Sequence, residues 1–210
     1  MYYGERLNSI SHLIGAVLAL VALGALLTIS IQTGDPWTII GFSVFGLSMV
    51  LLYTMSTLYH SFHPPHLKKL FKLLDHVSIY LLIAGSYTPF TTQRFEGAWS
   101  TGFTLLIWAL ALGGVAAKLV LPRLSDAIWS TVYVIFGWLA VLALKPMLDT
   151  VHPAALTLLV IGGLVYTSGV FVFISPKVKF RRAIWHGFVV AGAGVHWAAV
   201  LVGVVLAPAT

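Results

Sequence analysis

The sequence predicts an all-α fold, an integral membrane bundle of seven transmembrane helices. Its 210 residues are 59% hydrophobic and only 9% charged. A soluble domain carries about 25% charged residues, so this chain has too little charge to cover a surface that faces water. Seven stretches are each apolar over roughly the 20 residues that a helix needs to cross the hydrocarbon core. The polar segments between them are too short for another domain, so we expect a single membrane domain over residues 1–210.

The seven stretches are apolar on all sides, whereas a helix of a soluble bundle has an apolar stripe and a polar face. In chain order, the predicted spans are Ser9–Ile31, Trp37–Tyr59, Leu74–Thr91, Trp99–Val120, Ala127–Leu144, Ala154–Ile174 and Trp185–Leu206. Successive spans are separated by short polar segments, several of them rich in Pro or Gly, as is typical of turns. These segments are Thr33–Pro36, His63–His66, Arg94–Glu96, Pro122–Asp126, Lys145–Asp149 and Pro176–Lys179.

The basic residues predict the orientation of the bundle, because Lys and Arg gather in the cytoplasmic loops of membrane proteins. Only Arg94 and Lys145 fall on one side. The other ten are Arg6, Lys68, Lys69, Lys72, Lys118, Arg123, Lys177, Lys179, Arg181 and Arg182. We therefore expect a multi-pass protein of the cell membrane with a cytoplasmic N-terminus and an external C-terminus. The net charge of +6 is then explained by basic residues that set the orientation and contact anionic lipid head groups. We therefore expect membrane lipids as partners and exclude nucleic acid.

Polar side chains from distant parts of the sequence reach one depth in this topology. Ser56 and His60, four residues apart and so on one helix face, lie at the cytoplasmic end of the second span. Asp75 begins the third span and His186 the seventh. Because a lone charge inside an apolar segment costs several kcal/mol, Asp75 is expected to be paired, hydrated or coordinated. Imidazoles and a carboxylate without any cysteine are a donor set that suits zinc.

Simpler interpretations compete for the other histidines. His63, His66 and His152 are expected to be solvated loop residues, and His76 an interfacial anchor. His12 is more often a hydrogen-bonded packing residue than a ligand. His196 lies ten residues beyond His186, about 15 Å further along a helix axis, and is therefore expected to bond another helix or a water.

The chain resembles the hemolysin III proteins of bacteria, which are relatives of the progestin and adipoQ receptors within a wider group that includes alkaline ceramidases. The resemblance extends over essentially the whole chain. It is carried by four sequence blocks, Glu5–His12, Ser56–His60, Leu74–His76 with Ala84–Phe90, and Ala183–His186 with Val195–Trp197.

This resemblance implies a zinc ion near the cytoplasmic face. By position, His60 and His186 would be metal ligands, and Ser56 and Asp75 would position a water for catalysis. The third expected ligand is a histidine four residues before His186, but the chain has Arg182 there. A guanidinium cannot bind a cation, so three alternatives are open. His60, His186, water and Asp75 could hold the metal; His12 or His76 could supply the missing nitrogen; or Arg182 could pair with Asp75 at an empty site.

Two classes of function follow. The first is a zinc-dependent hydrolase of membrane lipid amides, which the wider group suggests. The second is a non-enzymatic membrane protein, either a regulator of membrane state, a receptor-like protein or a pore-forming, haemolytic protein. No row of charged or hydroxyl residues marks a conduction path through the seven spans.

Overall fold

The fold is an all-α bundle with seven membrane-spanning units, as predicted. The computed structural model describes Met1 and residues 4–206. Within these residues, the seven units long and apolar enough to cross a membrane are α1 (Arg6–Thr33), α2 (Pro36–Ser61), α3 (Pro65–Gln93), α4 (Gly97–Val120), α5–η1–α6 (Asp126–Thr150), α7 (Pro153–Ile174) and α8–η2 (Arg181–Leu206).

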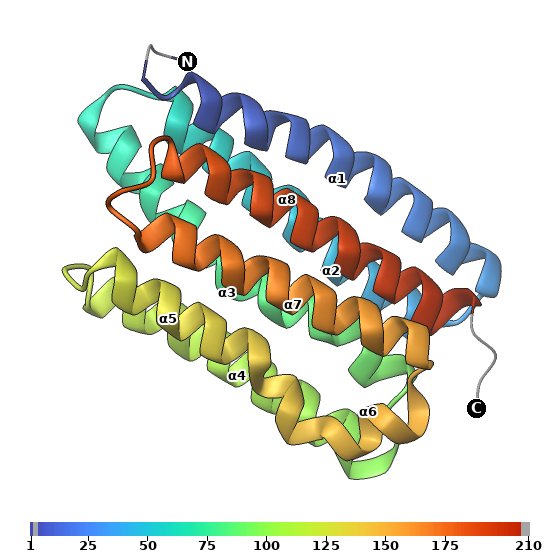
Figure 1. Cartoon of the computed structure of the whole chain (residues 1–210). Helices are drawn as coiled ribbons and strands as arrows, with labels where there is room; N and C mark the ends of the chain where they lie inside the picture. The colour runs from blue at the N-terminus through green and yellow to red at the C-terminus, as the bar shows by residue number, and fades with distance from the viewer. Residues whose placement is uncertain (2–3, 207–210) are drawn as a thin grey trace.

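The helices form two layers that share one long axis (Figure 1). Helix α8 packs between α1 and α7, and α7 packs on α5, while α2 and α3 follow one another from α1 towards α4. Because successive spans run in opposite directions, the starts of α1, α3 and α8 and the end of α2 lie together. We call this the N-terminal end of the bundle. The start of α1 and the end of η2 at Leu206 lie at opposite ends of the bundle (Figure 1).

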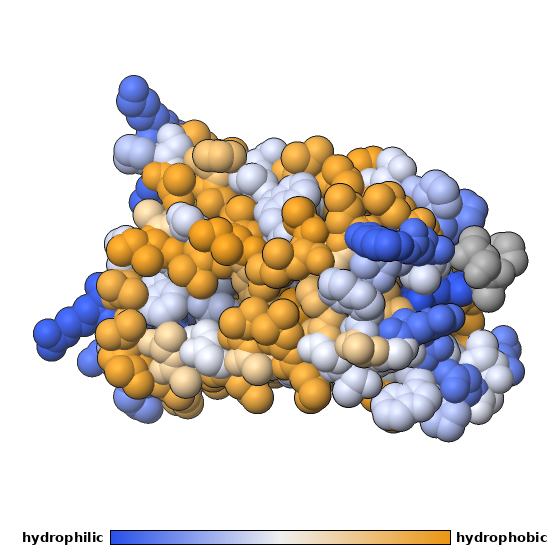
Figure 2. All heavy atoms as spheres, turned by 90° about the horizontal axis from the view of Figure 1, so that it is seen from below, coloured by the Kyte–Doolittle hydropathy of each residue, from blue (hydrophilic) through white to orange (hydrophobic). Residues whose placement is uncertain are grey.

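The outer surface carries the apolar side chains that a lipid-facing surface requires. Val21 is 68% exposed, Leu105 65% and Phe171 67%. Figure 2 shows hydrophobic residues over the middle of the face in view and hydrophilic residues towards its two ends. A soluble protein would pay heavily to expose such a patch to water, so this surface fits a multi-pass membrane protein.

Two predicted helix boundaries were wrong. Helix α3 begins at Pro65, nine residues before the predicted start at Leu74, so His66 lies in its first turn. Pro at the first helical position is favourable because its missing N–H would have no partner there. Residues Lys145–Asp149, predicted as a loop, are helical within α6 (Leu144–Thr150). There Lys145 Nζ lies 2.6 Å from the Asp149 carboxylate, a favourable pair one turn apart.

A 3₁₀ segment, η1 (Trp138–Ala143), interrupts the fifth span after α5 (Asp126–Gly137). Tyr87 of α3 satisfies backbone groups that the break leaves without helical partners. Its hydroxyl donates to the carbonyl of Gly137 at 2.6 Å and accepts from the N–H of Ala140 at 2.9 Å. Without such partners, backbone groups at membrane depth would cost several kcal/mol each, so Tyr87 stabilises the break.

Candidate functional site

The N-terminal end of the bundle brings together all four residues predicted for the site. Ser56, His60, Asp75 and His186 line one cavity, whose volume is about 380 Å³. Ser56, His60 and His186 are almost fully buried, and Asp75 is partly exposed. The assembly depends on the antiparallel packing of α1, α2, α3 and α8, which places residues more than 100 positions apart at one depth.

The imidazole of His60 is oriented by Glu5, the residue directly before α1. His60 Nδ1 lies 2.7 Å from Glu5 Oε2. Glu5 also accepts from the side chain of Asn8 and lies 3.7 Å from Lys68 Nζ. Partial burial raises the pKa of Glu5, but the hydrogen bonds from Asn8 and His60 and the charge of Lys68 outweigh it, so the pKa lies below its ordinary value. Glu5 is therefore a carboxylate, and His60 Nδ1 donates to it.

The imidazole of His186 is oriented by the first turns of α1. Its Nδ1 lies 3.0 Å from the backbone carbonyl of Asn8 and 3.2 Å from the hydroxyl of Ser11. A carbonyl oxygen can only accept a hydrogen bond, so Nδ1 of His186 carries the proton. The contact also fixes α8 to α1, since the two residues are 178 positions apart.

Both rings therefore present Nε2 as the nitrogen with a free lone pair. Neither Nε2 has a hydrogen-bond partner among the described residues. Metal-binding histidines usually donate their other N–H to a carboxylate or a backbone carbonyl, which sets the tautomer and the direction of the ring. His60 on Glu5 and His186 on the Asn8 carbonyl are examples of these two arrangements.

Ser56 and Asp75 add a hydroxyl and a carboxyl group to the same wall. The hydroxyl of Ser56 is buried and has no hydrogen bond of ordinary geometry to any described residue, although it lies beside the Asp75 carboxyl group. Buried hydroxyls normally have a partner. This pair is thus available to a water or to a polar group of a ligand.

His12 of α1 completes a cluster of three imidazoles. Its ring stacks on that of His186 with centroids 3.9 Å apart, and the rings of His186 and His60 are 4.9 Å apart. Both nitrogens of His12 are buried and make no hydrogen bond of ordinary geometry to any described residue, although the ring lies beside the backbone of His186. His12 is therefore a packing residue, as expected, since its ring is buried against His186 and Tyr53, but the expected hydrogen bond of ordinary geometry is absent among the described residues.

The described residues contain no group of three or more His, Asp or Glu side chains arranged to hold a metal ion. Arg182 is exposed at the mouth of the cavity and forms no ion pair with Asp75 within the described part of the chain. The alternative of an ion pair between Arg182 and Asp75 is therefore not found in the described part of the structure. His76 also lines the cavity, but its Nδ1 bonds the backbone carbonyl of Lys72.

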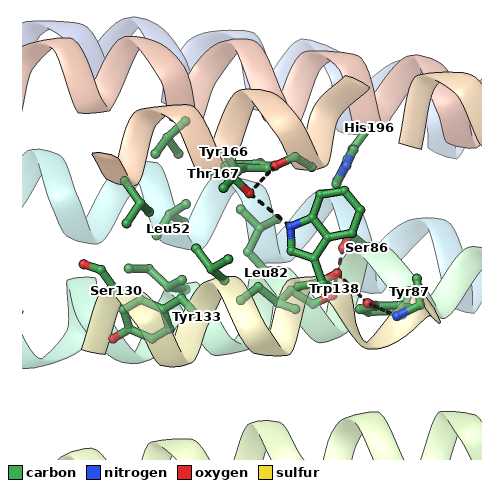
Figure 3. Close-up of a pocket in the computed structure, with 18 of the residues that line it drawn as sticks. Leu52, Leu82, Ser86, Tyr87, Ser130, Tyr133, Trp138, Tyr166, Thr167 and His196 are labelled. Atoms are coloured by element: carbon green, nitrogen blue, oxygen red, sulfur yellow. Dashed lines mark hydrogen bonds between the residues drawn. The ribbon is translucent and has the colours of Figure 1, made fainter. Parts of the chain in front are cut away.

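Deeper in the bundle the cavity is mainly apolar, with a few polar groups at mid-depth (Figure 3). The indole N–H of Trp138, in η1, donates to Thr167 Oγ1 at 3.0 Å. His196 of α8 points towards this region (Figure 3) and its Nε2 lies 3.4 Å from the Leu159 carbonyl, so it bonds another helix as predicted. The lining extends to Phe95 and Leu148, near the opposite end. Such a long apolar cavity with a polar end suits an acyl chain with a polar head.

Sequence reasoning missed the roles of several residues that line this cavity or lie around it. Glu5 precedes the first predicted span, but only the fold shows that its carboxylate meets the imidazole of His60. Nothing in the sequence indicated that Trp138 and Thr167 form a pair, since single aromatic and hydroxyl residues are common in apolar spans. Lys118, placed among the interfacial basic residues, is 7% exposed with Nζ 4.3 Å from the centre of the Trp129 ring.

Comparison with known proteins places these features in a family. A family model described as "Haemolysin-III related" matches residues 2–197. The chain is 40% identical to "Hemolysin-3 homolog" of Bacillus subtilis (strain 168) over 199 residues, which cover 94% of this chain and 92% of that protein. It is 42% identical to "Hemolysin-3" of Bacillus cereus, with 94% and 90% covered. It is also 30% identical to "Monocyte to macrophage differentiation factor" of Homo sapiens, with 94% and 83% covered.

Proposed function

The chain belongs to the haemolysin-III-related family of multi-pass membrane proteins, and from this and the cavity we propose that it is a zinc-dependent hydrolase of membrane lipid amides. One observation carries the proposal. His60 and His186 each hold Nδ1–H on an acceptor and leave Nε2 free, at the polar end of a long apolar cavity. The remaining predicted residues, Ser56 and Asp75, line the same end.

The residues present fit a zinc ion in part. The two imidazoles supply borderline nitrogen ligands with their supporting hydrogen bonds already made, which is the donor set that zinc prefers. A third protein ligand is not in place, because Arg182 occupies the position that the family resemblance gives to it. Catalytic zinc sites keep three protein ligands and an open position, so the site needs one more donor.

The chemistry that zinc supplies when bound is a lowered pKa of water and polarisation of the amide carbonyl. In the hydrolysis, water adds its hydroxyl to the acyl carbon, the C–N bond breaks, and the amine nitrogen takes the proton. Asp75 is the group that can take the proton from water and pass it to the leaving amine. Ser56 orients the Asp75 carboxyl or the substrate carbonyl through its unpartnered hydroxyl.

The substrate position follows from the shape of the cavity. Its volume of about 380 Å³ lies within the range of roughly 300–1,000 Å³ that is usual for small-molecule sites. Apolar walls such as Leu52, Leu82 and Val160 line the deeper part. An acyl chain would fill this part and place its amide beside Ser56 and Asp75. The site would then lie at the cytoplasmic face of the cell membrane, if the basic residues set the orientation as predicted.

A second function is favoured by a specific observation. Arg182 at the cavity mouth and the lack of a complete metal-binding group among the described residues suit a protein that binds a lipid in this cavity without cleaving it. Such a protein would be a receptor-like module or a regulator of membrane state. The name of the Bacillus cereus relative, Hemolysin-3, adds a haemolytic activity to this class.

Metal analysis of protein purified in mild detergent separates these two functions. The hydrolase should contain about one zinc per chain, as single catalytic sites do. His60→Ala should remove both the zinc and the release of fatty acid from a membrane lipid amide such as a ceramide. His152→Ala, at the opposite end of the bundle, is the matched control and should change neither. Wild-type protein that is folded, remains metal-free after equilibration with zinc and releases no fatty acid would defeat the hydrolase.

A further inference from the structure

Two basic residues at the N-terminal end of the bundle line the cavity. Most Lys and Arg residues of the chain gather at this end, but among the described residues only Lys72 of α3 and Arg182 of α8 line the cavity. A cation beside an apolar cavity attracts an anion unless a neighbouring acid already balances its charge. The charges around these two side chains therefore decide whether the cavity favours an anionic ligand.

Lys72 belongs to a balanced group of charges on α3, α4 and α5. The charged neighbours of Asp75 are Lys72 and Lys118. Lys118 in turn has Asp126 as its strongest charged neighbour. Two carboxyl groups thus face two ammonium groups, so these four charges can neutralise one another without a ligand.

Arg182 lies on the opposite wall, which α2 and α8 form, and has no acid to pair with. Its charge acts on Tyr59, His60 and His186, and it forms no ion pair with any described residue. The carboxylate of Glu5, which lies 2.7 Å from His60 Nδ1, is engaged there and with two further side chains. The guanidinium therefore has a fixed positive charge and five N–H donors that a ligand can use.

The hydroxyl of Tyr59 adds a second donor beside Arg182. Tyr59 lines the cavity, and its hydroxyl has no hydrogen bond to any described residue. Arg182 is the charged residue that acts on it most strongly, ahead of Asp75, Glu5 and Asp126. The planar fork of a guanidinium matches a carboxylate with two parallel hydrogen bonds, and the phenol hydroxyl can donate a third.

Arg182 is also well placed relative to the proposed substrate. It precedes His186 by four residues, so it lies on the same face of α8, about 6 Å nearer the end of the bundle. In the proposed function the acyl chain fills the deeper cavity and the amide lies beside Ser56 and Asp75. A group joined to the amide nitrogen through one carbon would extend from there towards the mouth. The inference rests on the proposed function in this respect alone, that the cavity holds a lipid amide, and it involves no metal.

We propose that this cavity binds N-acyl amino acids, lipid amides that carry a carboxylate beside the amide nitrogen, and that Arg182 and Tyr59 bind this carboxylate. A neutral lipid amide has no group that uses the charge of Arg182. A phosphate monoester carries about 1.5 to 2 negative charges at pH 7. Asp75 and Asp126, which also line the cavity, would repel it more strongly than they repel a carboxylate with a single charge.

The test compares two ligands of similar size that differ in charge. N-palmitoylglycine ends in a carboxylate, and N-palmitoylethanolamine ends in a hydroxyl group. Binding of each radiolabelled ligand to protein purified in mild detergent is measured for the wild type and for Arg182→Gln. The substitution should weaken N-palmitoylglycine at least about tenfold, because it removes hydrogen bonds between charged groups, and should leave N-palmitoylethanolamine unchanged. Partition into micelles cancels, since each comparison uses one ligand and two proteins.

Two further variants make the comparison specific. Arg181→Gln removes the same charge from the neighbouring residue, which does not line the cavity in the described structure, and should change neither affinity. Tyr59→Phe keeps the ring and removes the donor, so it should weaken N-palmitoylglycine by a few-fold and leave the neutral amide unaffected. Thermal unfolding checks that each variant is folded.

The outcomes for the carboxylate site and for the lipid cavity can be told apart. If Arg182→Gln weakens both ligands equally, or weakens neither, Arg182 does not bind the carboxylate and the inference is overturned, while the cavity remains a site for lipid amides. If the folded wild type binds neither ligand, the proposed binding of lipid amides in this cavity is wrong as well.

Discussion

Glu5 should control how tightly His60 binds a metal. The carboxylate lies 2.7 Å from His60 Nδ1, and the two side chains are 14% and 3% exposed, so water screens the pair weakly. Removing a partner of this kind typically weakens metal binding 10- to 100-fold, which corresponds to about 1.4–2.8 kcal/mol. Two variants separate the charge of Glu5 from its hydrogen bond.

Glu5→Gln keeps an oxygen that can accept from Nδ1 but removes the charge, so the loss of zinc affinity should be near the lower limit, about tenfold. Glu5→Ala removes the acceptor as well, and the loss should approach 100-fold. Zinc competition titrations in detergent would measure both. Glu96→Gln changes the other glutamate of the chain, at the opposite end of the bundle, and should have no effect. Full zinc affinity in folded Glu5→Ala would refute the role of Glu5.

The same carboxylate predicts a dependence of stability on pH. Hydrogen bonds from Asn8 and His60 and the charge of Lys68 overcome partial burial and lower the pKa of Glu5 below its usual value of 4.5. A lowered pKa means that the charged form stabilises the folded state above pH 4.5, and that this contribution disappears as pH falls through the native pKa. The difference in melting temperature between wild type and Glu5→Gln should therefore be largest near neutral pH and shrink in acid. A constant difference would contradict this reasoning.

Three further predictions test the fold. Gly114→Ala should destabilise the bundle by about 1–3 kcal/mol, because the added carbon would overlap the buried ring of Tyr80, whereas its neighbour Gly113→Ala has open space and should be neutral in thermal unfolding. Tyr87→Phe removes both hydrogen bonds at the start of η1 and should cost about 1–3 kcal/mol in the same assay; an unchanged melting temperature would show that the break needs no support. The chain has no cysteine, so a single cysteine can report orientation without background. Leu124→Cys, between α4 and α5, should react with an impermeant maleimide only from the cytoplasm and Glu96→Cys only from outside, and the reverse pattern would invert the predicted topology.

The spans were predictable because lipid imposes a simple rule on sequence. A segment of about 20 residues in a membrane must be apolar and helical, since its backbone groups can be satisfied only internally. This rule predicted the seven spans. Because successive spans alternate in direction, it also predicted that His60, Asp75 and His186 lie at the same depth in the membrane. The rule predicted the positions of the helix ends less accurately, because a helix can continue beyond the bilayer into water. The early start of α3 at Pro65 illustrates this.

The predicted depth of each residue in the membrane is not enough to determine the detailed contacts of the site. Glu5, Asn8 and His12 lie at the start of the first span, at the same end of the bundle as His60, but the rotation of each helix about its axis decides which of these side chains touch. The rotation of each helix is set by contacts with its neighbours. One such contact is the hydrogen bond from the hydroxyl of Tyr53 in α2 to the carbonyl of Val189 in α8, at 3.2 Å. The break at Trp138–Ala143 was missed for a similar reason, because its support comes from Tyr87 of another helix.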